Sequence, residues 1–247
     1  MFERRARRAR RPDAARSQHF LRSQALAAEI VRDAGVRPDE LVLDLGAGSG
    51  RLTAELARAA QRVVAVELDP RLSARLRGRW PNVHVVCGDA ASVPLPHDPF
   101  RVVANLPFSR TNAIFRHLLD DAEVPLVRAD LVVEWGVAVK RALPWPSSVN
   151  GVLWGARFSA SVARRLPRNA FVPPPRADAA VLVFERRELP LVASGEFARY
   201  ARFVAKGFRH GLRAVATTRT LRTMQLAGVE ARHLDAHEWA TLFAVAG

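Results

Sequence analysis

The sequence is poor in cysteine and lysine and has no long apolar run. Its one cysteine, Cys87, excludes an internal disulfide and suits a reducing cytoplasm. The seven histidines are scattered without the spacing of metal ligands, so we predict no metal site. No apolar stretch is long enough to span a membrane, and no apolar core follows the N-terminal charges as a signal peptide would require. We therefore expect a cytoplasmic protein without a membrane partner.

Positive charge dominates, and arginine carries almost all of it. The formal net charge is +14, and Lys140 and Lys206 are the only lysines. A strongly basic chain is attracted to polyanions, and nucleic acid is the first candidate. The length of 247 residues and the hydrophobic content of 49% suit one large domain, alone or with a small appendage.

The first sixteen residues form a separate basic segment, with seven arginines against Glu3 and Asp13. We expect residues 1–16 to be a flexible arm that contacts RNA phosphates. The arginines assigned to this contact are Arg4, Arg5, Arg7, Arg8, Arg10 and Arg11. A solvated tail without a partner and an Arg-rich mitochondrial presequence are the alternatives.

The segment 41–50 predicts a nucleotide site. An apolar run is followed by glycines at positions 46, 48 and 50, and a helical pattern extends from Arg51 to Ala60. Strand, glycine turn and helix build a nucleotide site at the end of the first strand of an α/β sheet, and glycine lets a ligand approach bare backbone. The spacing is not that of the dinucleotide fingerprint, and the absence of a following Gly-Lys-Ser/Thr excludes a P-loop. A tight turn without a ligand is the alternative.

Acidic residues follow the next two predicted strands. Glu67 ends the apolar run 63–66, where it is placed to accept hydrogen bonds from ribose hydroxyls. Asp89 follows the predicted strand 83–86, where it can accept a hydrogen bond from an exocyclic amine such as that of adenine. The glycine turn, Glu67 and Asp89 stand at successive strand ends and together predict a ligand of the adenosine type.

The segment 105–108 carries the predicted chemistry and follows a predicted strand at 100–104. The N6 amine of adenine is a poor nucleophile because its lone pair is delocalised into the ring. The Asn105 side-chain oxygen and the Leu106 carbonyl can localise that lone pair by accepting both amine hydrogens. Pro107 stiffens the turn by fixing φ, and Phe108 offers a flat face for the base. An ordinary Asn-Pro turn with a core aromatic residue is the alternative.

Five motifs stand in the order typical of one enzyme family. They are Gln18-x-Phe20-Leu21, Leu43-Asp44-Leu45-Gly46-x-Gly48-x-Gly50, Glu67-x-Asp69, Gly88-Asp89-Ala90 and Asn105-Leu106-Pro107-Phe108. The chain resembles the rRNA adenine-N6 methyltransferases, which use S-adenosylmethionine (SAM) and have a class I fold. This family includes the Erm macrolide-resistance enzymes and the small-subunit dimethyladenosine transferases. The resemblance covers residues 17 to about 185.

The resemblance implies the site residues. Those expected to contact SAM are Gln18, His19, Leu21, Gly46, Ala47, Gly48, Gly50, Glu67, Leu68, Asp89, Ala90 and Asn105. Those expected to act in catalysis are Asn105, Leu106, Pro107 and Phe108. Phe171 belongs to a segment that resembles a further family motif, which implies that Phe108 and Phe171 sandwich a flipped adenine. The chain departs from the family at His19, where Asn is commoner, and at residues 176–180, which lack the usual Val and Ser.

Two further groups of basic residues are expected to contact RNA. Arg164, Arg165 and Arg168 are predicted to form a basic cluster beside Phe171. Beyond residue 188 five basic residues recur at steps of three and four, so they are predicted to line one helix face. They are Arg199, Arg202, Lys206, Arg209 and Arg213. The alternative is that this face contacts only solvent. Apolar residues in the same region are expected to form a small core: Leu212, Leu221, Met224, Leu226, Leu234, Trp239, Leu242 and Phe243.

These observations predict an α/β protein with a class I SAM-dependent methyltransferase fold, a mostly parallel sheet and a small all-α C-terminal domain. The expected parts are the arm at 1–16, the catalytic domain at 17–187 and the RNA-binding helical domain at 188–247, in a monomer. The Arg-rich arm, Phe108 and the compact C-terminal region resemble the Erm branch. The expected reaction is therefore mono- or dimethylation of one adenine in 23S rRNA, which would give resistance to macrolides, lincosamides and streptogramin B.

Three alternatives stay open. The chain could be a small-subunit dimethyltransferase that modifies 16S rRNA during ribosome biogenesis. It could be a DNA adenine-N6 methyltransferase, although these usually carry a separate target-recognition domain that we do not find in the sequence. It could also be an RNA or transcription factor that binds SAM without catalysis, against which the intact Glu67, Asn105 and Phe108 argue.

Overall fold

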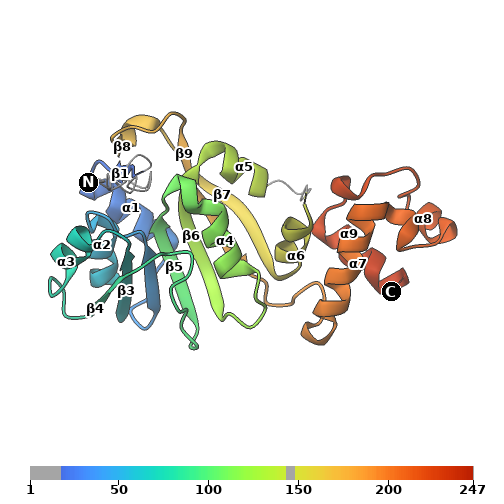
Figure 1. Cartoon of the computed structure of the whole chain (residues 1–247), viewed down its shortest axis with the longest axis horizontal. Coiled ribbons are helices and arrows are strands. Elements are labelled where there is room, and N and C mark those ends of the chain that lie inside the picture. Colours follow the sequence, from blue (N-terminus) through green and yellow to red (C-terminus); the bar gives the residue numbers. More distant parts are fainter. Residues whose placement is uncertain (1–17, 143–147, 247) are drawn as a thin grey trace, which may run out of the picture.

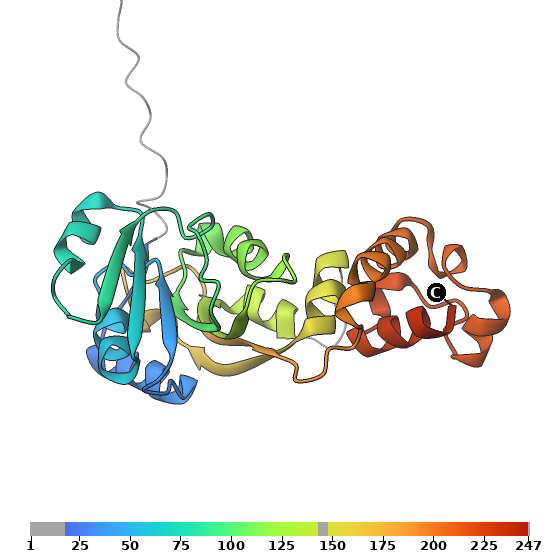
Figure 2. The same cartoon turned by 90° about the horizontal axis from the view of Figure 1, so that it is seen from below.

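The computed structural model describes residues 18–142 and 148–246. The predicted arm at 1–16 lies outside the described residues, so the RNA contacts of the six arginines assigned to them stay a prediction. These residues are Arg4, Arg5, Arg7, Arg8, Arg10 and Arg11. Figures 1 and 2 show a large α/β part and, at one end of an elongated molecule, a group of C-terminal helices.

A mixed sheet of seven strands forms the centre of the α/β part. In spatial order the strands are β4 (Val83–Cys87), β3 (Arg62–Glu67), β2 (Leu41–Leu45), β5 (Phe100–Asn105), β6 (Leu126–Glu134), β9 (Ala179–Arg186) and β7 (Phe158–Leu166). The first five are parallel to one another, and β9 runs antiparallel to both β6 and β7. The α/β class and the mostly parallel sheet predicted from the sequence are confirmed.

The central strands are mostly apolar because helices cover both faces of the sheet. In β5 every residue from Phe100 to Ala104 is buried, including Arg101. The Arg101 guanidinium is accommodated because it donates to the Gly35 carbonyl at 2.9 Å and pairs with Glu40 at 3.0 Å. A strand with helices on both faces must be apolar, and any charge buried in it must be paired and hydrogen-bonded.

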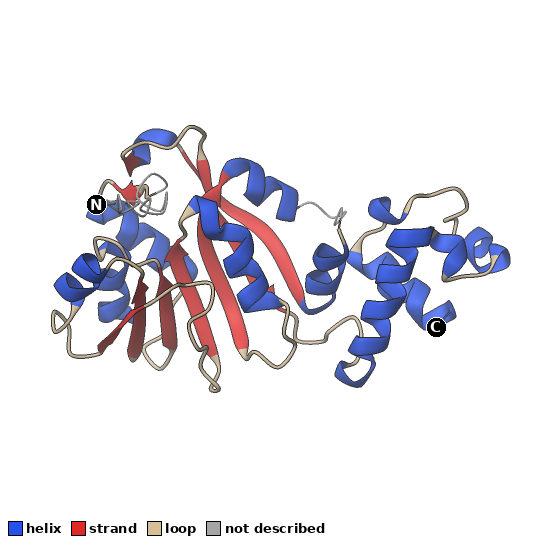
Figure 3. Ribbon diagram, viewed as in Figure 1, coloured by secondary structure: helices blue, strands red, loops and turns tan. Residues whose placement is uncertain are grey.

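Helices pack on the two faces of this sheet (Figure 3). On one face lie α1 (Gln24–Ala34) and α2 (Arg51–Ala59), packed against Val42, Val63 and Val103. On the other lie α4 (Thr111–Leu119) and α5 (Trp135–Ala142), packed against Leu43 and Val102. The short α3 (Pro70–Leu76) covers Ala65 of β3 through Leu76. The sheet and its helices therefore form one three-layered core.

The C-terminal helices have a core of their own. The elements are α6 (Val149–Arg157), η4 (Ser194–Glu196), α7 (Phe197–His210), η5 (Leu212–Ala214), α8 (Thr218–Thr223), η6 (Ala231–His233) and α9 (Ala236–Ala246). The apolar residues predicted to form a small core do pack together, around the fully buried Trp239 and Tyr200. Helix α6 precedes β7 in the chain, yet its Val152 and Ala156 belong to this core. The division at residue 188 stays a prediction.

A two-stranded sheet joins segments that are far apart in the chain. β1 (Phe20–Leu21) pairs antiparallel with β8 (Phe171–Val172), which follows the single turn η3 (Arg168–Ala170). This pairing brings the N-terminal motif beside the segment around Phe171. Within the part of the chain that is described, no helix has both the length and the apolar character needed to cross a membrane.

Candidate active site

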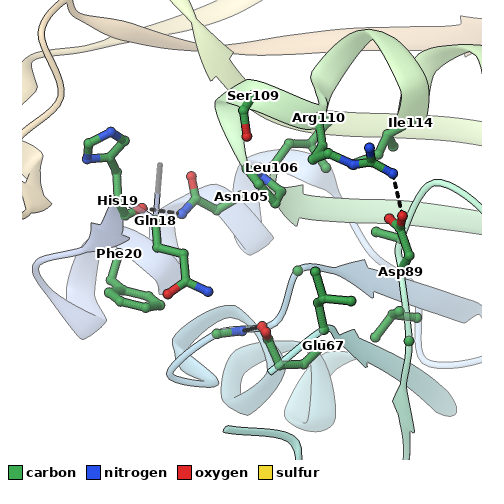
Figure 4. Close-up of a pocket in the computed structure, with 17 residues that line it drawn as sticks. Gln18, His19, Phe20, Glu67, Asp89, Asn105, Leu106, Ser109, Arg110 and Ile114 are labelled. Carbon is green, nitrogen blue, oxygen red and sulfur yellow. Dashed lines mark hydrogen bonds and ion pairs between the residues drawn. The ribbon is translucent and has the colours of Figure 1, made fainter. Parts of the chain in front are cut away.

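One cavity of about 530 Å³ lies at the carboxyl ends of β2, β3, β4 and β5 (Figure 4). This edge of an open parallel sheet is where such folds bind ligands. The cavity is lined by Gln18, His19, Phe20, Gly46, Gly48, Val66, Glu67, Leu68, Gly88, Asp89, Ala90, Asn105, Leu106, Pro107, Ser109, Arg110 and Ile114.

The glycine turn after β2 is packed tightly against two other segments of the wall. Gly46 and Gly48 have φ of +83° and +56°, which side chains rarely adopt. A Cβ on Gly48 would lie 2.7 Å from the Phe20 ring, and one on Gly46 would lie 3.1 Å from Pro107. The missing side chains therefore let the N-terminal motif and the segment after β5 close on the turn.

Glu67, at the end of β3, holds this turn in place. Its side chain is buried, and Oε2 accepts a hydrogen bond from the Gly48 amide at 2.7 Å. Oε1 accepts a second from the Asp69 amide at 2.8 Å. A carboxylate has about four acceptor positions, so Glu67 can still accept from a ligand hydroxyl in the cavity.

Asp44 in β2 is a buried acid that sequence reasoning did not assign to the site. Burial raises its pKa to about 7, a hydrogen bond from the Thr53 hydroxyl at 2.6 Å lowers the pKa, and the nearby Glu67 charge raises it. The available signal was a single carboxylate within an otherwise apolar strand. Two buried acids therefore lie close together here: Glu67 holds the glycine turn, and Asp44 joins β2 to Thr53 of α2.

Asp89, after β4, is linked across the cavity edge to Arg110. Its Oδ1 accepts from the Ala91 amide at 3.0 Å, and its Oδ2 accepts from the Arg110 guanidinium. Figure 4 shows this pair at the opposite end of the cavity from His19. Arg110 lies in η2 (Phe108–Arg110), immediately after the predicted catalytic segment.

Asn105, the last residue of β5, has an unmatched acceptor. Its Nδ2 donates to the His19 carbonyl at 2.7 Å, and its Oδ1 is buried without a hydrogen-bond partner among the described residues. A buried acceptor without a donor is costly, which points to a donor supplied by a ligand. The chemistry expected of Asn105 requires such an acceptor at the cavity wall.

The rings of Phe108 and Phe171 do not lie parallel, as the predicted sandwich around a flipped adenine would require. The two ring centroids are 6.3 Å apart in an edge-to-face arrangement at 72°, and Phe171 is fully buried. Rings that enclose a base must lie parallel on its two faces, and edge contact leaves no space between them. Phe171 is part of the core, because β8 pairs with β1 and its ring packs edge to face against Phe108.

The ring of His19 also contacts the ring of Phe108. The centroids of His19 and Phe108 are 5.4 Å apart at 44°. The His19 Nδ1–H donates to the Pro173 carbonyl at 2.9 Å, since a carbonyl only accepts. His19 therefore joins the N-terminal motif to the segments around Phe108 and Pro173.

Most of the residues predicted to contact SAM line the cavity. These are Gln18, His19, Gly46, Gly48, Glu67, Leu68, Asp89, Ala90 and Asn105. Three predicted residues do not line it. Leu21 and Ala47 are buried in the core. Gly50 is the N-cap of α2 and packs against Leu76.

Six residues of the cavity wall were not predicted as contacts: Phe20, Val66, Gly88, Ser109, Arg110 and Ile114. The nearest sequence signal was that Phe20 and Gly88 stand within the quoted motifs. Among the described residues, no group of three or more His, Cys, Asp or Glu could hold a metal ion.

The predicted cluster of Arg164, Arg165 and Arg168 is formed only in part, because Arg165 and Arg168 both bond to Asp178 whereas Arg164 turns to α1. Arg164 pairs with Glu29 at 2.6 Å and with Asp33 at 3.2 Å, both on α1. Arg165 pairs with Asp178 at 2.8 Å and lies over the Trp135 ring. The two side chains diverge because successive residues of a strand point to opposite faces. Arg168 lies in η3 and is exposed.

The predicted basic face of the C-terminal region is shorter than expected. Arg202, Lys206 and Arg209 are exposed on α7. Arg199 is on the same helix but pairs with Glu196 at 3.3 Å and lies over the Phe243 ring. Arg213 is not on α7, because Gly211, with φ of +82°, ends the helix before it.

Known proteins resemble this chain over most of its length. An rRNA adenine N-6-methyltransferase of Streptomyces fradiae is 36% identical over 78% of this chain, which matches 61% of that protein. The mycinamicin-resistance protein MyrB of Micromonospora griseorubida is 33% identical, with 92% of this chain and 76% of MyrB covered. The crystal structure of the 23S rRNA methyltransferase ErmE superposes with a TM-score of 0.81 at 29% identity, over 92% of this chain and 99% of ErmE. The pattern of the family described as "Ribosomal RNA adenine dimethylase" matches residues 13–236, and the chain belongs to this family.

Proposed function

We propose that this protein transfers a methyl group from SAM to the N6 amine of one adenine in 23S rRNA, and that the modified ribosome resists macrolides, lincosamides and streptogramin B. The observation that carries the proposal is the buried, unmatched Oδ1 of Asn105 at the wall of the cavity. The similarity to MyrB and ErmE supports the 23S rRNA substrate and the link to resistance.

The lining of the cavity offers groups that would suit each part of SAM. Bound SAM would supply a methyl group made electrophilic by the sulfonium. Glu67 would accept hydrogen bonds from the ribose, and Asp89 would accept from the exocyclic amine of the adenine ring. Leu68, Ala90 and Ile114 offer apolar walls at the Asp89 end. The amino-acid part would then extend toward Gln18 and Asn105.

The residues after β5 would prepare the target amine. The Asn105 Oδ1 and the Leu106 carbonyl would each accept one N6 hydrogen, which localises the nitrogen lone pair for attack. Removal of one such polar contact typically lowers kcat by about 10²- to 10³-fold. No strong base is needed, since the methylated amine becomes acidic and releases its proton afterwards. Much of the acceleration would come from holding the amine in line with the methyl group.

The RNA would be held by charge outside the cavity. The described candidates are the exposed Arg202, Lys206 and Arg209 on α7, Arg213 in η5 and Arg168 in η3. The arm at 1–16 would add further contacts. The C-terminal helices, residues 188–247, would act as the RNA-binding domain of a cytoplasmic monomer. Light scattering of the purified protein would test the monomeric state.

The test is methyl transfer from labelled SAM to protein-free 23S rRNA, protein-free 16S rRNA and assembled subunits, with primer extension to locate the adenine. We expect label on protein-free 23S rRNA at one adenine. Label confined to 16S rRNA would assign the chain to ribosome biogenesis instead. SAM binding without transfer to any RNA would overturn the proposed reaction and favour the non-catalytic alternative.

A further inference from the structure

The side chain of Arg110 has no role in the local helices. Arg110 is the last residue of η2 and leads directly into α4, and its side chain makes no capping hydrogen bond. The reason for an arginine at this position therefore lies in what its side chain reaches.

The Arg110 side chain crosses the edge of the cavity to Asp89. This ion pair joins two segments that the sheet does not connect at this point, the turn after β4 and the turn η2 after β5 (Figure 4). The Arg110 side chain is 47% exposed and that of Asp89 is 33% exposed. A partly exposed ion pair contributes little to stability, so fold stability does not explain why Arg110 is placed here.

The same end of the cavity exposes apolar surface. Leu68 lies beside the turn that holds Asp89, because the preceding Glu67 carbonyl accepts from the Gly88 amide at 3.0 Å. Its side chain is 52% exposed, one of five large apolar side chains open to solvent among the described residues. Ala90 and Ile114 complete the apolar wall beside the ion pair. A flat apolar ring that carries an amine would cover Leu68 and place its amine at Asp89.

We propose that Arg110 is a positioning residue that covers the adenine ring of the bound cofactor, its guanidinium plane on the base and its charge held by Asp89. This inference rests on the proposed function, since it presumes that the cavity takes SAM. A guanidinium stacks well on aromatic faces, and Arg supplies a planar group that Lys lacks. The Asp89 Oδ2 can accept from the base amine while it accepts from Arg110, because each oxygen has two acceptor positions.

The change in cofactor affinity on removal of the Arg110 side chain separates this role from one in which the Arg110–Asp89 pair blocks the cavity. If Arg110 covers the base, its removal weakens cofactor binding. If the ion pair instead blocked Asp89 and had to open, its removal would strengthen binding and speed association. A through-space effect on the cofactor's carboxylate would weaken binding only for ligands that carry the amino-acid part.

The experiment compares the full chain with Arg110→Ala, Arg110→Lys and Arg116→Ala. Arg116 is an exposed arginine of α4 that does not line the cavity, so its removal is a matched control for charge. The ligands are S-adenosylhomocysteine and 5′-methylthioadenosine, which lacks the amino-acid part. Affinities are measured by calorimetry and by displacement of labelled S-adenosylhomocysteine, and the melting temperature reports folding.

We expect Arg110→Ala to weaken both ligands by a similar factor, roughly fivefold or more, as a cation stacked on an aromatic face would. Arg110→Lys should recover only part of this loss, and Arg116→Ala should bind like the wild type. Unchanged or tighter binding by Arg110→Ala, or a loss seen only with S-adenosylhomocysteine, would overturn the inference. A wild-type chain that binds neither ligand would instead refute the proposed function itself.

Discussion

The side-chain amide of Asn105 is oriented by the backbone of His19. Nδ2 donates to the His19 carbonyl at 2.7 Å, so the carbonyl oxygen of the amide is left as the buried acceptor. His19 stands 86 residues earlier in the chain and is itself held by the Pro173 carbonyl through its ring. The N-terminal motif therefore acts on the site through its backbone as well as through its side chains.

Removal of the Asn105 side chain should abolish most of the activity without loss of RNA binding. For Asn105→Ala we expect kcat for rRNA methylation to fall by about 10²- to 10³-fold, because one acceptor for the amine is lost. Labelled methyl transfer and filter binding of the same RNA give the two readouts. Asn112→Ala, at an exposed position on α4, is the control. Methylation by Asn105→Ala at the wild-type rate would show that the acceptor is not used.

A side chain at Gly48 should disrupt the cofactor site. Gly48→Ala would place a Cβ 2.7 Å from the Phe20 ring at φ of +56°, so both strain and a clash result. We expect affinity for S-adenosylhomocysteine to fall by roughly tenfold or more, and stability to fall by about 1–3 kcal/mol. Gly78→Ala is the matched control, because Gly78 has φ of +72° and nothing within 4 Å of its added Cβ. Equal effects of the two substitutions on ligand binding would show that the packing of Phe20 on the turn is unimportant.

Asp44 should make the protein less stable at higher pH. Its pKa is raised from 3.8 to about 7 in the folded state, mainly by burial. The stabilisation relative to an ionised Asp44 is thus complete below pH 3.8 and is lost as the pH rises through about 7. Integration over the shift gives about 4 kcal/mol in total, of which about 2–3 kcal/mol falls between roughly pH 5 and 8.

Urea unfolding of the wild type and Asp44→Asn at several pH values measures this effect. The stability of the wild type relative to Asp44→Asn should decline from about pH 5 to 8 by the amount stated above. Asp39→Asn, which removes an exposed carboxylate, is the control. A constant difference between wild type and Asp44→Asn would mean that Asp44 is not a titrating group in this range.

The exposed basic residues of α7 should contribute to RNA affinity through charge. Replacement of Arg202, Lys206 and Arg209 by alanine should weaken binding to any rRNA fragment and reduce the slope of log affinity against log salt by about 1 per lost phosphate contact. Filter binding at several salt concentrations gives the slope. Arg164→Ala is the control, because its guanidinium is already paired with Glu29 and Asp33. An unchanged slope in the triple variant would show that this face of α7 contacts solvent and not RNA.

The sequence alone determined the order of the elements and the kind of residue at each strand end. The glycine turn, Glu67, Asp89 and Asn105 could be placed because an apolar run followed by a turn residue is a local pattern, read within about ten residues. Parallel strands then bring such ends to one edge of the sheet. The cavity lies at that edge, and these four features line it.

Only the tertiary structure decided how the side chains pair. The Arg110–Asp89 pair spans 21 residues, the Asn105–His19 bond 86 and the Arg164–Glu29 pair 135. The edge contact of Phe108 with Phe171 likewise depends on the pairing of β1 with β8. Such contacts are set by the packing of whole elements, which no short pattern records. The same physics explains why Arg164 and Arg165, neighbours in sequence, take partners on opposite faces of β7.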